Sequence, residues 1–161
     1  MIEIKRGNLI VAKPTIIYDD IFSRSVILLS EHDKKETIGF ILNKKVDLRI
    51  SNIIPNIKVD IDLFFGGPVE TNSIFFIYNN KKKVSESIKI NDYFSWGGDI
   101  NQVVKLINEK KISKDEIKFF LGYSGWSKSQ LYNEIKSNSW IIKKEYDSNI
   151  ICSNPKNMWR N

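Results

Sequence analysis

Cysteine and histidine are almost missing from this chain of 161 residues, which contains only Cys152 and His32. A single cysteine cannot form a disulfide within the chain, and one cysteine with one histidine is too few for a Cys/His zinc site. Neighbouring acidic residues such as Asp19 and Asp20 lack the spacing of a calcium-binding loop and are typical of turns. We therefore expect no metal and no cofactor.

Long apolar runs are also missing, since none approaches the roughly 18 residues of a membrane-spanning helix. The first residues, MIEIKRGNLIVAKP, carry early charges and lack the apolar stretch and the cleavage site of a signal peptide. Apolar residues nevertheless make up 42% of the chain and aromatic residues 12%, which excludes a disordered chain. We expect a folded, cytoplasmic protein with no membrane partner.

Arginine is scarce, because 21 of the 25 basic residues are lysine. The net charge of +6 is compatible with nucleic acid, but proteins that read bases and phosphates usually rely on the two-pronged arginine side chain. Lysine, isoleucine and asparagine are abundant together, a pattern typical of proteins from AT-rich genomes. A nucleic-acid partner is therefore an alternative that we do not favour.

No repeat, low-complexity tract or Pro/Ser-rich linker divides the chain, so we take residues 1–161 as a single domain. Apolar runs predict strands, and three-to-four spacing behind capping residues predicts helices. Strands in clusters, with helices between some of them, are typical of the α+β class. The predicted strands are residues 8–12, 25–31, 37–42, 63–65, 73–78, 88–90, 93–96, 117–121, 140–146 and 149–153, and the predicted helices are residues 47–54, 99–111 and 127–138.

The most site-like segment is the glycine-rich stretch that follows the strand at residues 117–121. Gly122, Ser124 and Gly125 precede a helix that Gln130 helps to cap. A serine on a sharp turn before a helix is the nucleophile position of α/β-hydrolases, but their G-x-S-x-G motif has its second glycine one place later, and their histidine follows the serine. We interpret the glycines as packing positions and the hydroxyls as caps. A hydrolase or transferase at this turn is the alternative.

Two other segments have simpler interpretations. Gly66, Gly67 and Pro68 form a tight turn that allows two backbones to approach, without the lysine and spacing of a phosphate-binding loop. His32, at the end of a strand, is more typical of a hydrogen-bonded structural histidine than of a ligand or base. Backbone amides at the start of the helix after Trp126 would suit a small anion or a carboxylate.

These segments together resemble the AlgH/YqgE family of bacterial proteins. The resemblance rests on ordered motifs through nearly the whole chain, among them D-x-x-F-x-R-S-V with a following E-H, then G-x-x-x-N-[KR], G-G-P-V and L-G-Y-S-G-W. One departure is Lys45, where the family usually has proline. The matching segments are residues 9–14, 20–32, 39–44, 66–69 and 121–126, followed by Gln130, Leu131, Glu134, Ile135, Asn138 and Trp140.

The resemblance implies a complex α+β fold in which a β-barrel-like mixed sheet is surrounded by helices, and a bacterial cytosolic protein with a suggested role in transcriptional regulation. We expect a non-enzymatic binding or regulatory domain whose partner is an unknown protein or small molecule, and we leave the oligomeric state open. A ligand site requires that the polar candidates meet in one pocket. The candidate binding or family-motif residues are Arg24, His32, Asn43, Gly66, Gly67, Pro68, Gly122, Ser124, Gly125, Trp126 and Gln130.

Overall fold

The computed structural model describes residues 2–16, 19–127 and 129–159. Over these ranges the chain is mostly strand with a few short helices, and the predicted α+β class is confirmed. The strands are β1 (Leu9–Ala12), β2 (Val26–His32), β3 (Glu36–Ile41), β4 (Lys45–Arg49), β5 (Asp62–Phe65), β6 (Val69–Asn79), β7 (Ile88–Lys89), β8 (Phe94–Trp96), β9 (Ile117–Ser127) and β10 (Trp140–Lys143). The helices are α1 (Ile100–Asn108), α2 (Gln130–Lys136) and α3 (Pro155–Met158), with 3₁₀ turns η1 (Pro14–Ile16), η2 (Ile50–Asn52) and η3 (Ser148–Cys152).

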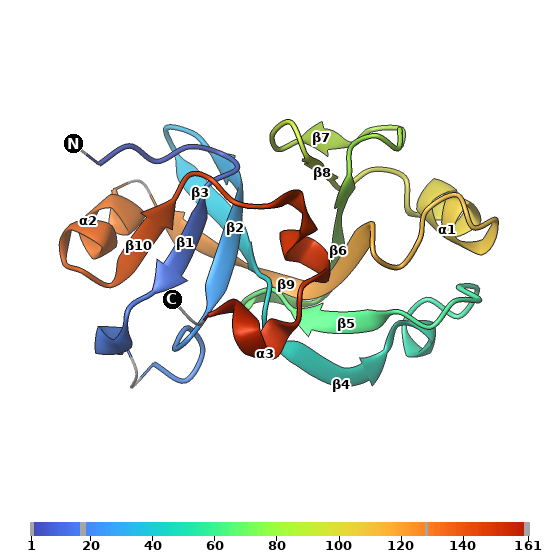
Figure 1. The fold of residues 1–161 in the computed structure, drawn as a ribbon, viewed down its shortest axis with the longest axis horizontal. Helices are drawn as coiled ribbons and strands as arrows, with labels where there is room; N and C mark the ends of the chain where they lie inside the picture. The colour runs from blue at the N-terminus through green and yellow to red at the C-terminus, as the bar shows by residue number, and fades with distance from the viewer. Residues whose placement is uncertain (1, 17–18, 128, 160–161) are drawn as a thin grey trace.

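The strands form one curled sheet around β9 (Figure 1). The N-terminal part of β9 lies between β5, which runs parallel to it, and β6, which runs antiparallel. Its C-terminal part pairs with β3, from which the sheet continues through β2 and β1 to β10. β9 therefore joins two half-sheets. The first contains β10, β1, β2 and β3, and the second contains β4 to β8.

The helices lie at the periphery of this sheet. In Figure 1, α2 lies beside β10 at one end of the molecule and α1 lies at the opposite end. The described helices have 9, 7 and 4 residues, which is too little helix to cover a sheet of ten strands. The sheet is therefore a curled half-barrel, and the helices do not surround it as the family resemblance implied.

The buried strand β2 shows how the core is built on both sides of the sheet. Leu28 packs with Phe40 in a cluster that contains residues of both half-sheets. Ile27 and Leu29 face the other way and pack with Trp126 in a second cluster. Successive side chains of a strand point to opposite faces, so a continuous apolar run is the expected pattern for a strand that is covered on both.

Helix α1 begins where it was predicted, behind a capping residue at position 99. The Asp99 carboxylate accepts hydrogen bonds from the backbone amides of Asn101 and Gln102, which have no partner within the helix. Val103 and Ile107, one turn apart, are buried in the core of the second half-sheet. The helix ends at residue 108, three residues earlier than predicted.

One predicted helix and one predicted strand are wrong. Residues 47–54 are not a helix, because β4 occupies their first part and pairs with β5, and η2 follows it. Residues 149–153 are not a strand, because most of them belong to η3, whose first turn is held by Asp147 accepting from the Asn149 amide at 2.8 Å. The first error arose because a short apolar segment takes its conformation from a strand partner elsewhere in the chain. The second arose because local bonds to Asp147 favour a 3₁₀ turn over an extended segment.

Candidate functional site

The predicted turn at residues 122–126 is part of a strand. β9 continues through this segment to Ser127, and the strand–turn–helix arrangement expected there is absent. Gly122 has φ of +71°, a conformation that favours glycine, and it stands where β9 passes from the second half-sheet to the first. The glycine therefore allows β9 to change direction between its two sets of partners.

The Gly66-Gly67-Pro68 segment crosses over β9 at this point. It leads from β5 on one edge of β9 to β6 on the other. A Cβ atom on Gly66 would lie 2.3 Å from the Gly122 carbonyl oxygen, and one on Gly67 would lie 2.2 Å from the Tyr123 backbone. Real Cβ atoms do not approach so closely, so the crossing requires glycine. The expected close approach of two backbones is present, and the glycines of both motifs serve it.

Ser124 is packed inside this crossing. Its side chain is 0% exposed, and its hydroxyl donates to the Gly66 carbonyl oxygen at 3.0 Å. The same oxygen accepts from the Ile41 amide at 3.0 Å. The Gly66 carbonyl, just after β5, therefore joins β9 to β3, and the serine hydroxyl is directed at the backbone and away from solvent.

Trp126 and Gln130 belong to a hydrogen-bonded cluster around Glu134 of α2. One oxygen of Glu134 accepts from the indole nitrogens of Trp126 at 3.1 Å and Trp140 at 2.9 Å. The other oxygen accepts from the Gln130 amide at 3.0 Å. The two indole rings meet edge to face at 6.1 Å and are nearly buried. This carboxylate explains why tryptophan, glutamine and glutamate occur together in the motif, and it attaches α2 to β9 and β10.

Arg24 and Asn43 lie together in a groove of about 440 Å³ beside α3, which Lys156 and Trp159 also line. The Asn43 amide accepts from the Val26 backbone amide at 3.0 Å and donates to the Arg24 carbonyl at 2.8 Å. Arg24 has φ of +57°, so Asn43 holds a turn in an unusual backbone conformation. The role of Asn43 in this groove is largely to shape it.

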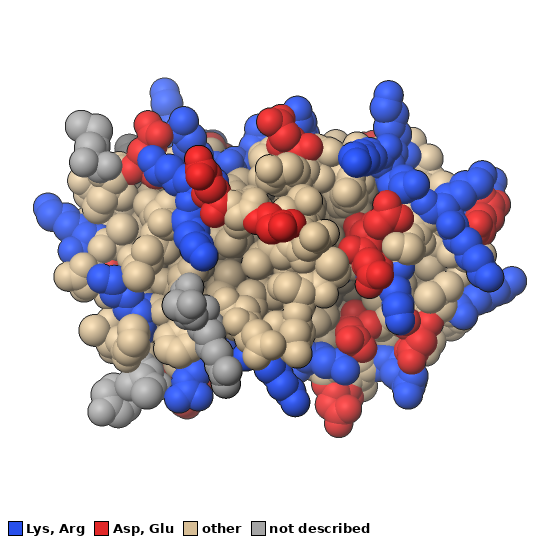
Figure 2. Space-filling view, in the orientation of Figure 1, with Lys and Arg blue, Asp and Glu red and all other residues tan. Residues whose placement is uncertain are grey.

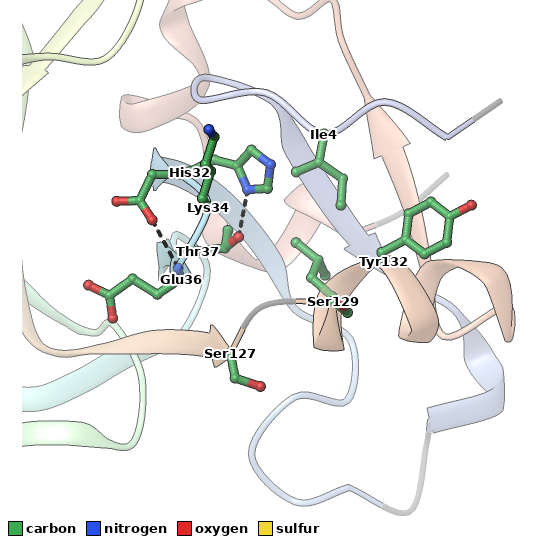
Figure 3. Close-up of a pocket in the computed structure, with 10 residues that line it drawn as sticks. Ile4, His32, Lys34, Glu36, Thr37, Ser127, Ser129 and Tyr132 are labelled. Atoms are coloured by element: carbon green, nitrogen blue, oxygen red, sulfur yellow. Dashed lines mark hydrogen bonds between the residues drawn. The ribbon is translucent and has the colours of Figure 1, made fainter.

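His32 lines a separate cavity of about 430 Å³ (Figure 3). Its Nδ1 lies 2.7 Å from the Thr37 hydroxyl across the β2–β3 pair, so one ring nitrogen is engaged in the fold. Asp33 in the same hairpin has its pKa lowered, because its carboxylate accepts from the backbone amides of Glu36 and Lys35. The full lining is Ile4, His32, Asp33, Lys34, Glu36, Thr37, Ser127, Ser129, Leu131 and Tyr132.

The polar candidates therefore do not meet in one pocket. Arg24 and Asn43 share the groove beside α3, His32 faces a different cavity, and Ser124 is buried at the strand crossing. Among residues 2–16, 19–127 and 129–159, no three His, Cys, Asp or Glu side chains are grouped so that they could hold a metal ion. No helix within those ranges is long and apolar enough to cross a membrane.

The sequence interpretation missed Lys118, a basic residue in the apolar run of β9. Lys118 is 3% exposed, and its Nζ donates to the Ile151 carbonyl at 3.1 Å and lies 3.5 Å from the centre of the Phe64 ring. Burial lowers the pKa of this amine to about 7, against the opposing effect of Asp62 and Cys152. The sequence did offer a signal for its burial, because Lys118 lies between Ile117 and the two phenylalanines that follow it in β9.

Comparison with known proteins gives consistent matches over nearly the whole chain. The family model described as AlgH-like matches residues 9–161. A UPF0301 protein of Cytophaga hutchinsonii is 37% identical over 97% of this chain and 86% of its own length, and one of Parabacteroides distasonis is 37% identical over 96% and 79%.

Two solved structures have a similar fold. A crystal structure of a protein from Corynebacterium diphtheriae has a TM-score of 0.80 at 22% identity, covering 98% of this chain and 85% of that one. The solution structure of the AlgH protein from Pseudomonas aeruginosa has a TM-score of 0.75 at 21% identity, covering 96% and 86%. At these identities the likeness concerns the fold.

Proposed function

The chain belongs to the AlgH-like family, and from this premise we propose that residues 1–161 form one non-enzymatic binding domain with a regulatory role in the bacterial cytoplasm. The observation that carries the proposal is the His32 cavity, whose volume of about 430 Å³ lies in the range of small-molecule sites, roughly 300–1,000 Å³. Ser124, on which an acyl-transfer enzyme would depend, lies outside its lining and is bonded to the backbone.

The wall of the cavity indicates the kind of ligand. Ile4, Leu131 and Tyr132 supply apolar surface, and His32 and Ser127 supply polar groups. The charged side chains of the lining belong to Asp33, Lys34 and Glu36, and Figure 3 shows the His32 ring bonded to Thr37. Ligand sites in proteins commonly combine an apolar wall with a few polar groups that fix orientation. The ligand that fits is a small molecule, or a short segment of a partner protein, with an apolar body and one hydrogen-bonding group.

His32 is the group that would orient this ligand. Its Nδ1 is engaged by Thr37, and its Nε2 makes no hydrogen bond to the described residues. An imidazole held at one nitrogen presents the other in a defined direction, as a donor or an acceptor according to its tautomer. The cavity also contacts α2 through Leu131, so a bound ligand would affect the position of that helix.

The single histidine makes the test direct, because NMR of the side chain shows one imidazole. We would titrate the full chain with a defined panel of metabolites and with the small-molecule fraction of a bacterial extract. We expect the His32 ring signals to shift on binding, and His32→Gln to weaken binding by about tenfold, the equivalent of one good hydrogen bond. Lys156→Ala, in the groove beside α3, should bind as tightly as the unchanged protein.

Two results would contradict the proposal. In one, no probe moves the imidazole signals. In the other, a ligand binds equally well to His32→Gln and to the unchanged protein, which would place its site elsewhere.

Direct DNA binding is the regulatory alternative, and a separate measurement addresses it. On the face shown in Figure 2, Lys and Arg side chains are interspersed with Asp and Glu side chains. A mixed surface of this kind favours weak association that depends on salt more than on sequence. We expect gel shifts at physiological salt to show no preference for promoter DNA over random DNA. A strong preference would mean that the domain regulates by reading DNA itself.

A further inference from the structure

Lys118 is a buried amine with fewer hydrogen-bond partners than it has donors. A lysine ammonium carries three N–H groups, and here one hydrogen bond, to the Ile151 carbonyl, is formed within the described part of the chain. The Phe64 ring lies 3.5 Å from Nζ and offers its negative face to a cation. The surroundings therefore provide one acceptor and one π face, which is too little for a buried primary ammonium.

The amine lines a cavity of about 380 Å³ between β5, β9 and the segment that follows η3. Titratable side chains line it on each of these sides: Asp60 just before β5 and Asp62 at its start, Lys114 and Asp115 before β9, and Cys152 in η3. This cavity shares no lining residue with the His32 cavity. It is a second site, independent of the function proposed above.

We propose that Lys118 and this cavity form a covalent binding site for small, uncharged aldehydes, which the Lys118 amine takes up as an imine. Besides Lys118 itself, the lining contains three carboxylates and one lysine. The cations that pair with Asp62 and Asp60 are Lys45 and Arg49, which lie outside the lining, so the wall disfavours an anionic compound. The volume of about 380 Å³ admits a small aldehyde, and the polar side chains of Ser153 and Asn154 suit a hydroxylated one.

The reaction requires only the amine and the aldehyde. The nitrogen lone pair of neutral Lys118 attacks the carbonyl carbon, a C–N bond forms, and one nitrogen proton moves to the oxygen to give a carbinolamine. The hydroxyl then leaves as water with the second nitrogen proton, and a C=N double bond remains. One amine and one aldehyde give one imine and one water, without oxidation or reduction.

The product fits the surroundings of Lys118 better than the free ammonium does. When this imine takes up a proton from water, the resulting iminium carries one N–H group, and the Ile151 carbonyl is placed to accept it. Its positive charge lies where the Phe64 ring stabilises a cation. The mismatch of three donors with one acceptor is therefore removed by the reaction itself.

The reaction at Lys118 depends on pH, because only the neutral amine attacks the aldehyde. The pKa of about 7 means that roughly half of the amine is neutral at pH 7, whereas an exposed lysine with a pKa of about 10.4 is almost wholly protonated. Asp62 and Cys152 favour the ammonium, but burial outweighs them. The rate of imine formation at Lys118 should rise through pH 7, and the rates at exposed lysines should rise only at much higher pH.

The test compares two lysines of the same cavity in one sample. The full chain is treated with glycolaldehyde and cyanoborohydride, which converts an imine into a stable secondary amine, and peptide mass spectrometry gives the rate at each lysine. We expect Lys118 to react at least about tenfold faster than Lys114 at pH 7. In the urea-unfolded chain the two rates should become equal. With glyoxylate, an anionic aldehyde, most of the rate difference between Lys118 and Lys114 should disappear.

Two results would overturn the proposal, and neither depends on a variant that has to fold. One is a native chain in which Lys118 reacts no faster than Lys114 with glycolaldehyde. The other is a rate at Lys118 that does not change between pH 6 and pH 8, about one unit either side of the amine pKa.

Discussion

The strand β9 carries two buried polar side chains, Ser124 and Lys118, whose hydrogen-bonding situations differ. Ser124 has one hydroxyl donor, and the Gly66 carbonyl accepts it. Lys118 has three donors, and one carbonyl accepts one of them. The serine lies in a motif that suggests chemistry, yet its position is structural. The lysine lies in no motif, yet its amine is the group with unused bonding capacity next to a cavity.

The contrast between Ser124 and Lys118 shows that the glycine-serine motif marks a place where the backbone geometry restricts which residues fit. At the crossing of residues 66–68 over β9, glycine is required because an added Cβ atom would lie near 2.3 Å from a backbone atom of the other segment. The Ser124 hydroxyl adds a hydrogen bond between the two segments. Chemical reactivity depends instead on burial and on incomplete pairing. Those properties arise for Lys118 from Phe64 and Ile151, which are distant from it in sequence.

The most severe test of the structural side of this comparison is Gly122→Ala. Its Cβ would lie 2.3 Å from the Gly67 carbonyl oxygen, and alanine disfavours φ of +71°. We expect a loss of more than about 4 kcal/mol in the free energy of unfolding, or no folding at all.

Gly125→Ala is the matched control in the same motif. The nearest atom to a Cβ there is 3.6 Å away, so the free energy of unfolding should change by less than about 0.5 kcal/mol. Urea unfolding followed by tryptophan fluorescence measures both variants. If the two alanines have similar effects, the crossing does not explain the motif.

The chemical side of the comparison is tested by the pH dependence of stability. The pKa of Lys118 is lowered to about 7 in the folded protein, so between pH 7 and about 10 the unfolded chain binds more protons than the folded one. Stability of the unchanged protein relative to Lys118→Met should therefore rise across this window, by on the order of 3 kcal/mol. Below pH 7 the lysine is charged in both states and the difference should be constant.

Unfolding of both proteins in urea at several pH values gives this difference directly, because all other titrating groups are shared. Methionine has similar length and no charge, so the variant should be at least as stable as the unchanged protein at pH 7. A flat difference across the window would mean that Lys118 keeps an ordinary pKa, and the contrast with Ser124 would lose its basis.

Apart from the Gly125→Ala control, the smallest effect is expected for Ser124→Ala. The substitution removes one hydrogen bond, but the Gly66 carbonyl keeps the bond from the Ile41 amide, so we expect a loss of about 1 kcal/mol. The His32 ring signals and their response to ligand should remain. Loss of ligand binding in a folded Ser124→Ala protein would instead connect the crossing to the binding site.

Local patterns predicted a large part of the fold. The strands β1, β2, β3 and β5 follow from apolar runs, and α1 follows from the Asp99 cap and its apolar spacing. The predicted helix at 47–54 failed because β5 offers that segment a strand partner. The predicted turn at 122–126 failed because β3 and β6 continue to pair with β9 through it. Pairing between distant segments decided each of these cases.

The candidate sites depended even more on distant contacts. His32 and the glycine motifs were identified from the sequence, but the cavity beside His32 also needs Ile4, Ser127 and Tyr132 from other parts of the chain. Glu134 was identified as a helical residue of the family motif, and its bonds to two indoles come from the packing of α2 against β9 and β10.

The sequence by itself determined the α+β class, the apolar strands, the cap of α1 and membership of a family recognised by spaced motifs, because these are properties of neighbouring residues. Only the tertiary structure decided that Ser124 is packed against a carbonyl and that Lys118 is buried with a single acceptor. A side chain's burial and its hydrogen-bond partners are set by segments far away in the chain, and the same residue type is solvated or reactive according to what those segments place around it.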